Sequence, residues 1–171
     1  MKSTGVIRRI DELGRIVLPK EIRRNLGIRE GENLEIFVEE DKMILKKFSK
    51  IKDYEEIIKS IGEIVANIYD HKIIVTDREK VIYSNIENIE SVSLDKNLIN
   101  FIQNRESVLK NSLQAYHFNE ELKGYYFIMP IITSTDCLGL VLIYSEKELK
   151  EENINLLKLV TVLISSKIDI A

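Results

Sequence analysis

Four short runs rich in apolar residues, separated by turn signals and one proline, lie within the first 48 residues of this 171-residue chain, and they leave few folds open. Short runs of this kind are typical of β-strands, in which successive side chains point to opposite faces of a sheet. The runs predict strands at residues 3–11, 14–19, 33–40 and 43–48. Pro19 suits the first position of a helix of at most two turns that ends at Gly27. The chain therefore begins with two strands, a short helix and two more strands.

A module of this size has little interior in which to bury its own apolar strands. Domains near 50 residues hide only about 60% of the surface that the unfolded chain exposes, and many need help from a partner chain. A two-fold homodimer supplies that help and repeats every cationic side chain at a spacing that suits a DNA groove. The sequence predicts a homodimer, or a homotetramer built as a dimer of dimers.

Charge is distributed unevenly along the chain, whose net charge is −3. Residues 1–29 carry eight Lys and Arg against three Asp and Glu, whereas residues 51–171 carry 13 against 19. Because the Debye length is about 8 Å in physiological salt, the basic segment attracts anions independently of a distant acidic domain. Charge alone allows two interpretations of the basic segment: its cations form solvated surface ion pairs, or they form a binding face for a polyanion.

The stretch "MKSTGVIRRIDELGRIVLPKEIRRNLGIREGENLEIFVEEDKMILKKF", residues 1–48, resembles the N-terminal domain of the AbrB/SpoVT-type transition-state regulators. The resemblance implies a swapped-hairpin β-barrel, in which two chains interleave their hairpins, and a DNA-binding face. The DNA-contacting arginines that it implies are Arg8, Arg15, Arg23 and Arg24, and Arg9 stands where some relatives have lysine. Arginine suits this role because its planar fork makes bidentate contacts to phosphate or to guanine.

The remainder of the chain reads as a second domain after a short linker at residues 49–52. Helical spacing of apolar residues predicts helices at 53–69, with Asp53 as N-cap, at 94–105 and at 151–170. Short apolar runs predict strands at 72–77, 81–85, 124–133 and 138–145. The expected fold class is α+β, with an AbrB-like domain at residues 1–50 and an α/β domain at 53–171 whose element order resembles a GAF domain.

Two roles are open for the second domain. The GAF resemblance implies a pocket for an unidentified small-molecule effector within residues 84–123, whereas the alternative is a domain kept for oligomerisation alone. The last helix is apolar on nearly all sides, which favours burial on more than one face, in a helical bundle with residues 53–69 at a dimer interface.

Other functional classes find little support in the sequence. One cysteine, Cys137, and two distant histidines, His71 and His117, form neither a metal-ligand pattern nor a catalytic constellation, so neither an enzyme nor a cofactor is expected. The N-terminus has no apolar signal and no run is long enough to span a membrane, which predicts a cytoplasmic, nucleoid-associated protein.

The expected function is a sequence-specific regulator that binds double-stranded promoter DNA and activates or represses sporulation genes. The alternative is an antitoxin, because related barrels occur in that class. Antitoxins of this kind end in a short disordered tail, whereas the region after residue 50 is long and patterned for folding.

Overall fold

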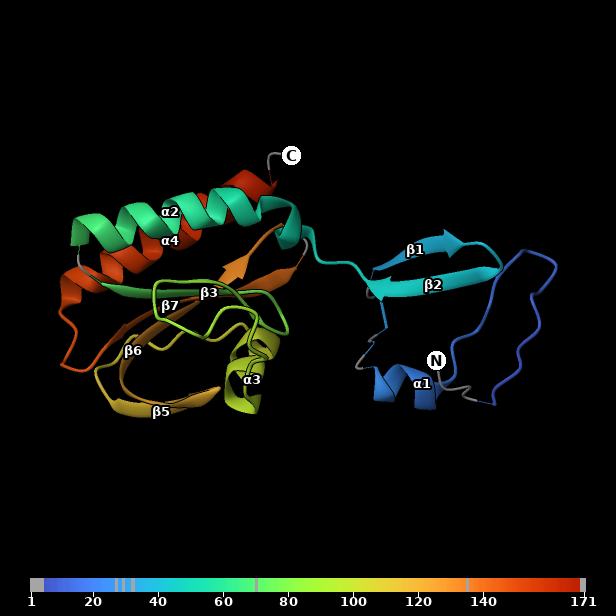
Figure 1. The fold of residues 1–171 in the computed structure, drawn as a ribbon, viewed down its shortest axis with the longest axis horizontal. Coiled ribbons are helices and arrows are strands. Elements are labelled where there is room, and N and C mark those ends of the chain that lie inside the picture. Colours follow the sequence, from blue (N-terminus) through green and yellow to red (C-terminus); the bar gives the residue numbers. More distant parts are fainter. Residues whose placement is uncertain are drawn as a thin grey trace. The chain divides into compact units, whose positions relative to one another are not determined.

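The computed structural model describes residues 5–26, 28, 30–31, 33–69, 71–134 and 136–169. It divides into two compact units, Met1–Phe48 and Ser49–Ala171. Both units combine helices with antiparallel strands (Figure 1), so the fold class is α+β as predicted. Gly27, expected to end the first helix, lies outside the described residues.

The first unit contains one helix, α1 (Lys20–Asn25), and a two-stranded antiparallel sheet of β1 (Leu34–Glu39) and β2 (Lys42–Lys47). The register places Glu35 opposite Lys46 and Glu39 opposite Lys42. Opposite charges on facing residues favour this pairing over a slipped one. The hairpin predicted at residues 33–48 is confirmed. Pro19 is the N-cap of α1 and not its first residue.

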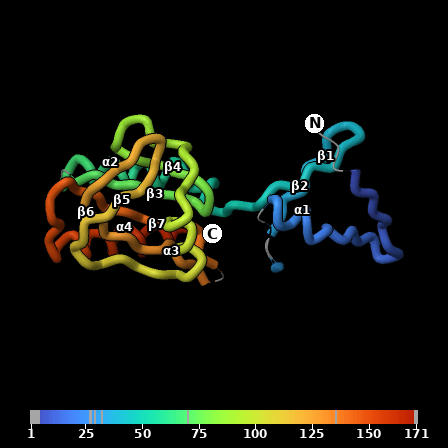
Figure 2. The backbone as a smooth tube through the Cα atoms, turned by 90° about the horizontal axis from the view of Figure 1, so that it is seen from below, coloured from blue at the N-terminus to red at the C-terminus, as the bar shows by residue number. Residues whose placement is uncertain are grey.

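The strands predicted at residues 3–11 and 14–19 are wrong for the single chain. In the described residues 5–18 the backbone forms no strand, and Figure 2 shows it as an extended loop around the turn at 11–14. A strand is stabilised by hydrogen bonds to a neighbouring strand. Within the described part of this chain, β1 and β2 pair with each other and leave these segments without a ladder.

The second unit is built on a five-stranded antiparallel sheet with the order β4-β3-β7-β6-β5. Its strands are β3 (Lys72–Thr76), β4 (Val81–Ser84), β5 (Leu113–Phe118), β6 (Glu120–Ile132) and β7 (Cys137–Ser145). Strand β7 lies at the centre, and all but its last residue are buried. A strand buried on both faces needs a continuous apolar run, which "LGLVLIY" supplies.

Helices cover both faces of this sheet. Helices α2 (Glu55–Tyr69) and α4 (Glu151–Asp169) cover one face, and α3 (Lys96–Asn104) covers the other (Figure 1). One buried cluster joins α2 and α4 to the sheet, and a second joins α3 to it. Asp95 caps α3 by accepting hydrogen bonds from the backbone N of Asn97 and Leu98. Among the described residues, no helix is long and apolar enough to cross a bilayer.

Two predicted details of the second unit are wrong. Residues 50–52, expected in the linker, begin a 3₁₀ helix, Lys50–Tyr54, because Ile51 is fully buried in the core beneath α2 and α4. Asp53 lies inside this 3₁₀ helix and is not the N-cap of α2. Strand β5 was not expected from the sequence, because it is an edge strand whose inward residues, Tyr116 and Phe118, alternate with exposed ones over a short span.

Candidate nucleic-acid interface

The turn at residues 11–15 is organised by Asp11. The backbone N of Asp11 donates to the carbonyl of Arg15 over 3.1 Å, and the backbone N of Gly14 donates to the carbonyl of Asp11 over 2.9 Å. Oδ1 of Asp11 accepts from the backbone N of Leu13 and of Arg15, at 3.0 and 2.8 Å. Gly14 has a φ of +75°, which glycine adopts without steric cost. The turn predicted at residues 11–14 is therefore confirmed.

Arg15 lies at the end of this turn, and its guanidinium group is bonded to Asp11 through Nε. Its Nε donates to Oδ2 of Asp11 over 2.7 Å, and 70% of the Arg15 side chain remains exposed. The hydrogen bond from the backbone of Arg15, and then the one from its side chain, lower the pKa of the Asp11 carboxyl below its ordinary value. Asp11 is therefore charged at neutral pH and Arg15 is a partly ordered, solvent-facing cation.

Arg8 and Arg9 lie in the segment that leads into the turn. Both are exposed, and Nη1 of Arg8 donates to the backbone carbonyl of Ile7 over 3.2 Å. Neither side chain forms an ion pair with another described residue. Both charges are exposed to an incoming polyanion.

Arg23 and Arg24 occupy the last turn of α1. A cation at this end is favoured by the partial negative charge of the helix C-terminus. Arg24 is exposed, whereas Arg23 is half-buried, and its Nε is buried with no hydrogen-bond partner among the described residues. The single chain therefore presents Arg24 fully and Arg23 only in part.

The structure places the five predicted arginines on three neighbouring stretches of the first unit: the segment before the turn, the turn itself and α1. Of the five, Arg15 is the one whose side chain pairs with a carboxylate in the described part of the chain. Sequence reasoning missed that carboxylate. The spacing of Asp11 and Arg15 across a turn that contains glycine was the signal that could have found it.

The first unit has an unusually exposed apolar surface. None of its described residues is buried, and thirteen large apolar side chains are between 37% and 88% exposed. They include Ile7, Val17 and Leu13 around the turn and Ile36 and Val38 on β1. So many exposed apolar side chains are unusual in a stable protein and are typical of a surface that another molecule covers.

Aromatic side chains fill the interior of the second unit where the GAF resemblance implied a pocket. Between the sheet and α3, the rings of Tyr116 and Tyr126 pack edge to face at 4.8 Å, and Tyr126 and Tyr144 lie 4.9 Å apart. Tyr126 is fully buried, and its hydroxyl donates to the carbonyl of Leu122 over 2.6 Å. These three rings occupy the space beside α3.

An open hollow of about 650 Å³ lies instead at the surface of this unit. Its lining is polar and comes from the loop after β4 and the turn between β5 and β6: Ser84, Asn85, Ile86, Glu87, Asn88, Glu90 and Asn119. The amides of Asn85 and Asn119 are already used, since Asn85 bonds to the backbone of Ile73 and His71 and Asn119 bonds to the carbonyl of Asn88.

The histidines and the cysteine have structural surroundings. His71 contacts Asn153 at the start of α4, and His117 is exposed on the edge strand β5. Cys137 is buried, and burial is the main cause that raises the pKa of its thiol. In the described part of the chain, no group of three His, Cys, Asp or Glu side chains is arranged to hold a metal ion.

Comparison with known proteins assigns each part of the chain to a known group. Residues 7–53 match the family model described as "Antidote-toxin recognition MazE, bacterial antitoxin". The transition state regulatory protein AbrB of Bacillus subtilis (strain 168) is 60% identical over 48 residues, which are 28% of this chain and 50% of AbrB. The solution structure of the N-domain of the transcription factor abrB is also 60% identical, covering 28% of this chain and 92% of that one, with a TM-score of 0.27.

The second unit has a structural neighbour as well. A crystal structure of a methyl-accepting chemotaxis protein, residues 122 to 287, covers 71% of this chain and 96% of that chain with a TM-score of 0.54 and 13% identity. At this identity the likeness concerns the fold alone.

Two further sequence matches cover the second unit and most of the whole chain. Residues 53–167 match the family model described as "Stage V sporulation protein T C-terminal, transcription factor". Stage V sporulation protein T of Bacillus subtilis (strain 168) is 37% identical over 155 residues, which are 86% of this chain and 87% of that protein. The chain therefore belongs to the stage V sporulation protein T family of transcription factors.

Proposed function

We propose that this chain is a sequence-specific regulator that binds promoter DNA as a dimer, contacts it through Arg8, Arg9, Arg15, Arg23 and Arg24, and activates some sporulation genes while repressing others. The observation that carries the proposal is the surface of the first unit, where these arginines stand among apolar side chains that the chain itself leaves uncovered. The 60% identity of this unit to AbrB, a transition state regulatory protein, supports it. The function is regulatory and not enzymatic, and it would be carried out at the nucleoid.

The dimer follows from the energetics of the first unit. Burying apolar surface contributes about 25 cal/mol per Å², and no described residue of this unit is buried in the single chain. Segments 5–10 and 15–18 are rich in apolar residues, as expected of strands, but have no partner strand in the described chain. A second copy that pairs with these segments would supply both the ladder and the apolar cover, as in a swapped-hairpin barrel.

Substitution of the arginines tests the binding face. A dimer carries each arginine twice, and removing one bond to a DNA phosphate flattens the slope of log K against log salt by about 0.9. We expect Arg15→Ala and Arg24→Ala to weaken binding to promoter fragments and to lower this slope. An arginine that reads a base edge also relaxes sequence preference, by about 1 to 3 kcal/mol for each bidentate pair.

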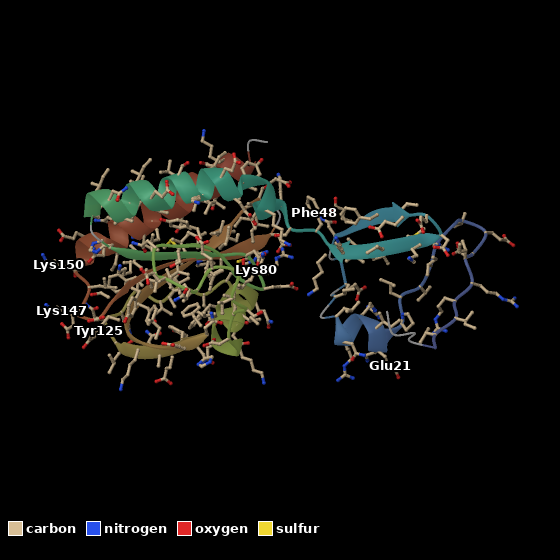
Figure 3. All side chains as sticks on the ribbon, viewed as in Figure 1. Glu21, Phe48, Lys80, Tyr125, Lys147 and Lys150 are labelled. Carbon is tan, nitrogen blue, oxygen red and sulfur yellow. The ribbon has the colours of Figure 1, made fainter. Side chains whose placement is uncertain are left out.

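The control is Lys147→Ala, which removes an exposed cation from the second unit (Figure 3). This variant should keep the affinity and the salt slope of the original protein. If Arg15→Ala and Arg24→Ala proteins that are folded and of unchanged mass also keep both, the proposed face is wrong.

An antitoxin is the second candidate, because residues 7–53 match a family model described for a bacterial antitoxin. That match covers the first unit and the start of the second. The rest of the chain forms a five-stranded sheet with two buried clusters, which is not the extended tail expected of an antitoxin. Limited proteolysis separates the two functions: a stable core near residues 49–169 supports the regulator, whereas rapid loss of this region supports a toxin-wrapping tail.

The second unit would serve oligomerisation, and fewer observations support a GAF-like sensing role. Helices α2 and α4 carry exposed apolar residues that a second copy could cover: Ile57, Ile64, Ile68, Leu159, Val162 and Leu163. The polar hollow after β4 lies within the stretch expected to hold an effector. A thermal-shift screen of cell metabolites against the full chain would reveal an effector as a rise in Tm, and a substitution such as Asn88→Trp in the hollow should abolish that rise.

A further inference from the structure

An acidic side chain lies among the proposed DNA contacts, and its charge opposes them. Asp11 stands between Arg9 and Arg15 in the most basic part of the chain, and it is ionised at neutral pH because the bonds from Arg15 lower its pKa. A carboxylate at this place repels phosphate. An exposed ion pair also contributes little to stability. Charge attraction to DNA and the small stability of an exposed ion pair therefore do not account for the bond between the Asp11 carboxylate and the Arg15 side chain.

The two carboxylate oxygens of Asp11 have different hydrogen-bond partners. Oδ1 accepts the two backbone N–H groups that close the turn, from Leu13 and Arg15. Oδ2 accepts the Nε of Arg15 over 2.7 Å. One oxygen therefore shapes the backbone, and the other holds a side chain.

Holding Nε leaves a defined edge of the guanidinium available. Among the described residues, Nη1 and Nη2 of Arg15 have no hydrogen-bond partner, and the side chain is 70% exposed. These two nitrogens form the end-on fork that bonds to two acceptors at once, such as O6 and N7 of guanine or two phosphate oxygens. An arginine tied at Nε has fewer rotamers to lose when that fork meets DNA.

We propose that Asp11 is a positioning residue for DNA recognition, which holds Arg15 through Nε so that its Nη1–Nη2 fork is preorganised for one site on the DNA. This inference rests on the proposed function of the first unit. It has a distinctive consequence: removing a negative charge from the interface should weaken specific binding, although charge alone predicts that it strengthens binding.

The test compares two neutralising substitutions at neighbouring positions in the full chain. Asp11→Asn keeps an oxygen for the backbone bonds of the turn and loses the carboxylate that holds Nε. Glu12→Gln removes the same charge one residue away, from an exposed side chain that forms no hydrogen bond or ion pair with Arg15. The probes are a duplex selected from a random pool by the unsubstituted protein and a scrambled duplex of the same length and composition.

We expect Asp11→Asn to bind the selected duplex about five- to tenfold more weakly, since the pair occurs twice in a dimer. The same protein should bind the scrambled duplex at least as tightly as before. Glu12→Gln should bind both duplexes somewhat more tightly. A turn that had merely loosened would lower the affinity for both duplexes alike, so the contrast between the two is the readout of positioning.

A double-mutant cycle identifies the route of the effect. In an Arg15→Ala background, Asp11→Asn should cause no further loss on the selected duplex, because the side chain that it positions is absent. The positioning role is overturned if Asp11→Asn binds the selected duplex as tightly as Glu12→Gln does. It is also overturned if Asp11→Asn lowers the affinity for this duplex by the same factor in the Arg15→Ala background as in the unsubstituted protein. If Arg15→Ala itself keeps full affinity, the proposed interface fails and Asp11 loses its role with it.

A second variant keeps the test decisive if Asp11→Asn does not fold. Arg15→Lys retains the charge and the backbone bond to Oδ1 but has no planar fork. Its affinity for the selected duplex should fall by a similar factor, and its affinity for the scrambled duplex should fall little. Unchanged discrimination between the two duplexes in this variant would also overturn the proposal.

Discussion

Single residues in the second unit show how burial changes acid–base behaviour. Burial, assisted by the nearby carboxylate of Asp95, raises the pKa of Tyr116 to about 12. Burial also raises the pKa of Tyr126, whose ring lies between Tyr116 and Tyr144. These hydroxyls remain neutral in the fold because an ionised phenol would lose its water shell in the core.

The raised values predict loss of the fold in base. The pKa of an unfolded tyrosine is near 10, so the contribution of Tyr116 to stability is complete below about pH 10 and disappears as the pH rises toward 12. Tyrosinate absorbance should therefore appear in two steps, first from solvent-exposed phenols and then, from the buried rings, together with loss of the circular dichroism of the sheet.

Tyr126→Phe serves as the control for this titration. It removes one buried phenol, so the second absorbance step should shrink, while the loss of the hydrogen bond to Leu122 costs about 0.5–1.5 kcal/mol of unfolding free energy. Titration of all tyrosines in a single step near pH 10, with the sheet intact, would contradict the assignment.

At the scale of elements, α4 has two apolar faces with different environments. Leu157, Val160 and Ile164 face the core and are almost fully buried, whereas Leu159 and Val162 are 56% and 62% exposed. The sequence pattern, apolar on nearly all sides, was correct, but only the core-facing side is covered within one chain. Burial of the other face, in the predicted helical bundle at a dimer interface, stays a prediction.

The two faces of α4 should respond differently to substitution. Leu157→Ala should lower the unfolding free energy of the second unit by about 2–5 kcal/mol, because it leaves a cavity in the core. Val162→Glu should leave that free energy nearly unchanged and lower the oligomer mass, since the charge would be buried without a partner at an apolar interface. Urea denaturation measures the first effect, and sedimentation equilibrium measures the second.

A charge change elsewhere on the surface of the same helix provides the control. Lys167→Ala removes the charge at an exposed position about 140° around the helix from Val162 and should alter neither quantity strongly. If Val162→Glu leaves the oligomer mass as it was, α4 is not part of an interface between copies.

At the scale of the whole molecule, the two units differ in how far they can stand alone. The second unit has two buried clusters, one on each face of its sheet, whereas no described residue of the first unit is buried. Phe48 closes the first unit, and Ser49 begins the second (Figure 3). We therefore expect the second unit, and not the first, to be stable as a single chain.

Separate fragments should show this difference directly. Residues 49–171 should fold and unfold cooperatively at any concentration, whereas residues 1–48 should be folded only as a dimer, with a Tm that rises with protein concentration. Sedimentation and thermal melts across a range of concentrations measure both. A folded monomer of residues 1–48 at micromolar concentration would rule out the obligate dimer.

Local structure could be predicted from the amino-acid sequence wherever the pattern was strong. The hairpin at residues 33–48, the turn at 11–14 and the long helices followed from alternation, helical spacing and turn chemistry, which act between near neighbours. The five arginines were candidate DNA contacts from the sequence as well, because a basic segment in an acidic chain and a resemblance over 48 residues need no coordinates, and their role stays a prediction.

Contacts between side chains and between strands became clear from the tertiary structure. Ile51 belongs to the core of the second unit because a space beneath α2 and α4 receives it, and β5 exists because β6 offers it an edge. The segments at 5–10 and 15–18 are not strands in one chain, since pairing depends on a partner and not on alternation. The bond between Asp11 and Nε of Arg15 likewise required coordinates, because a short turn can direct two charged side chains together or apart.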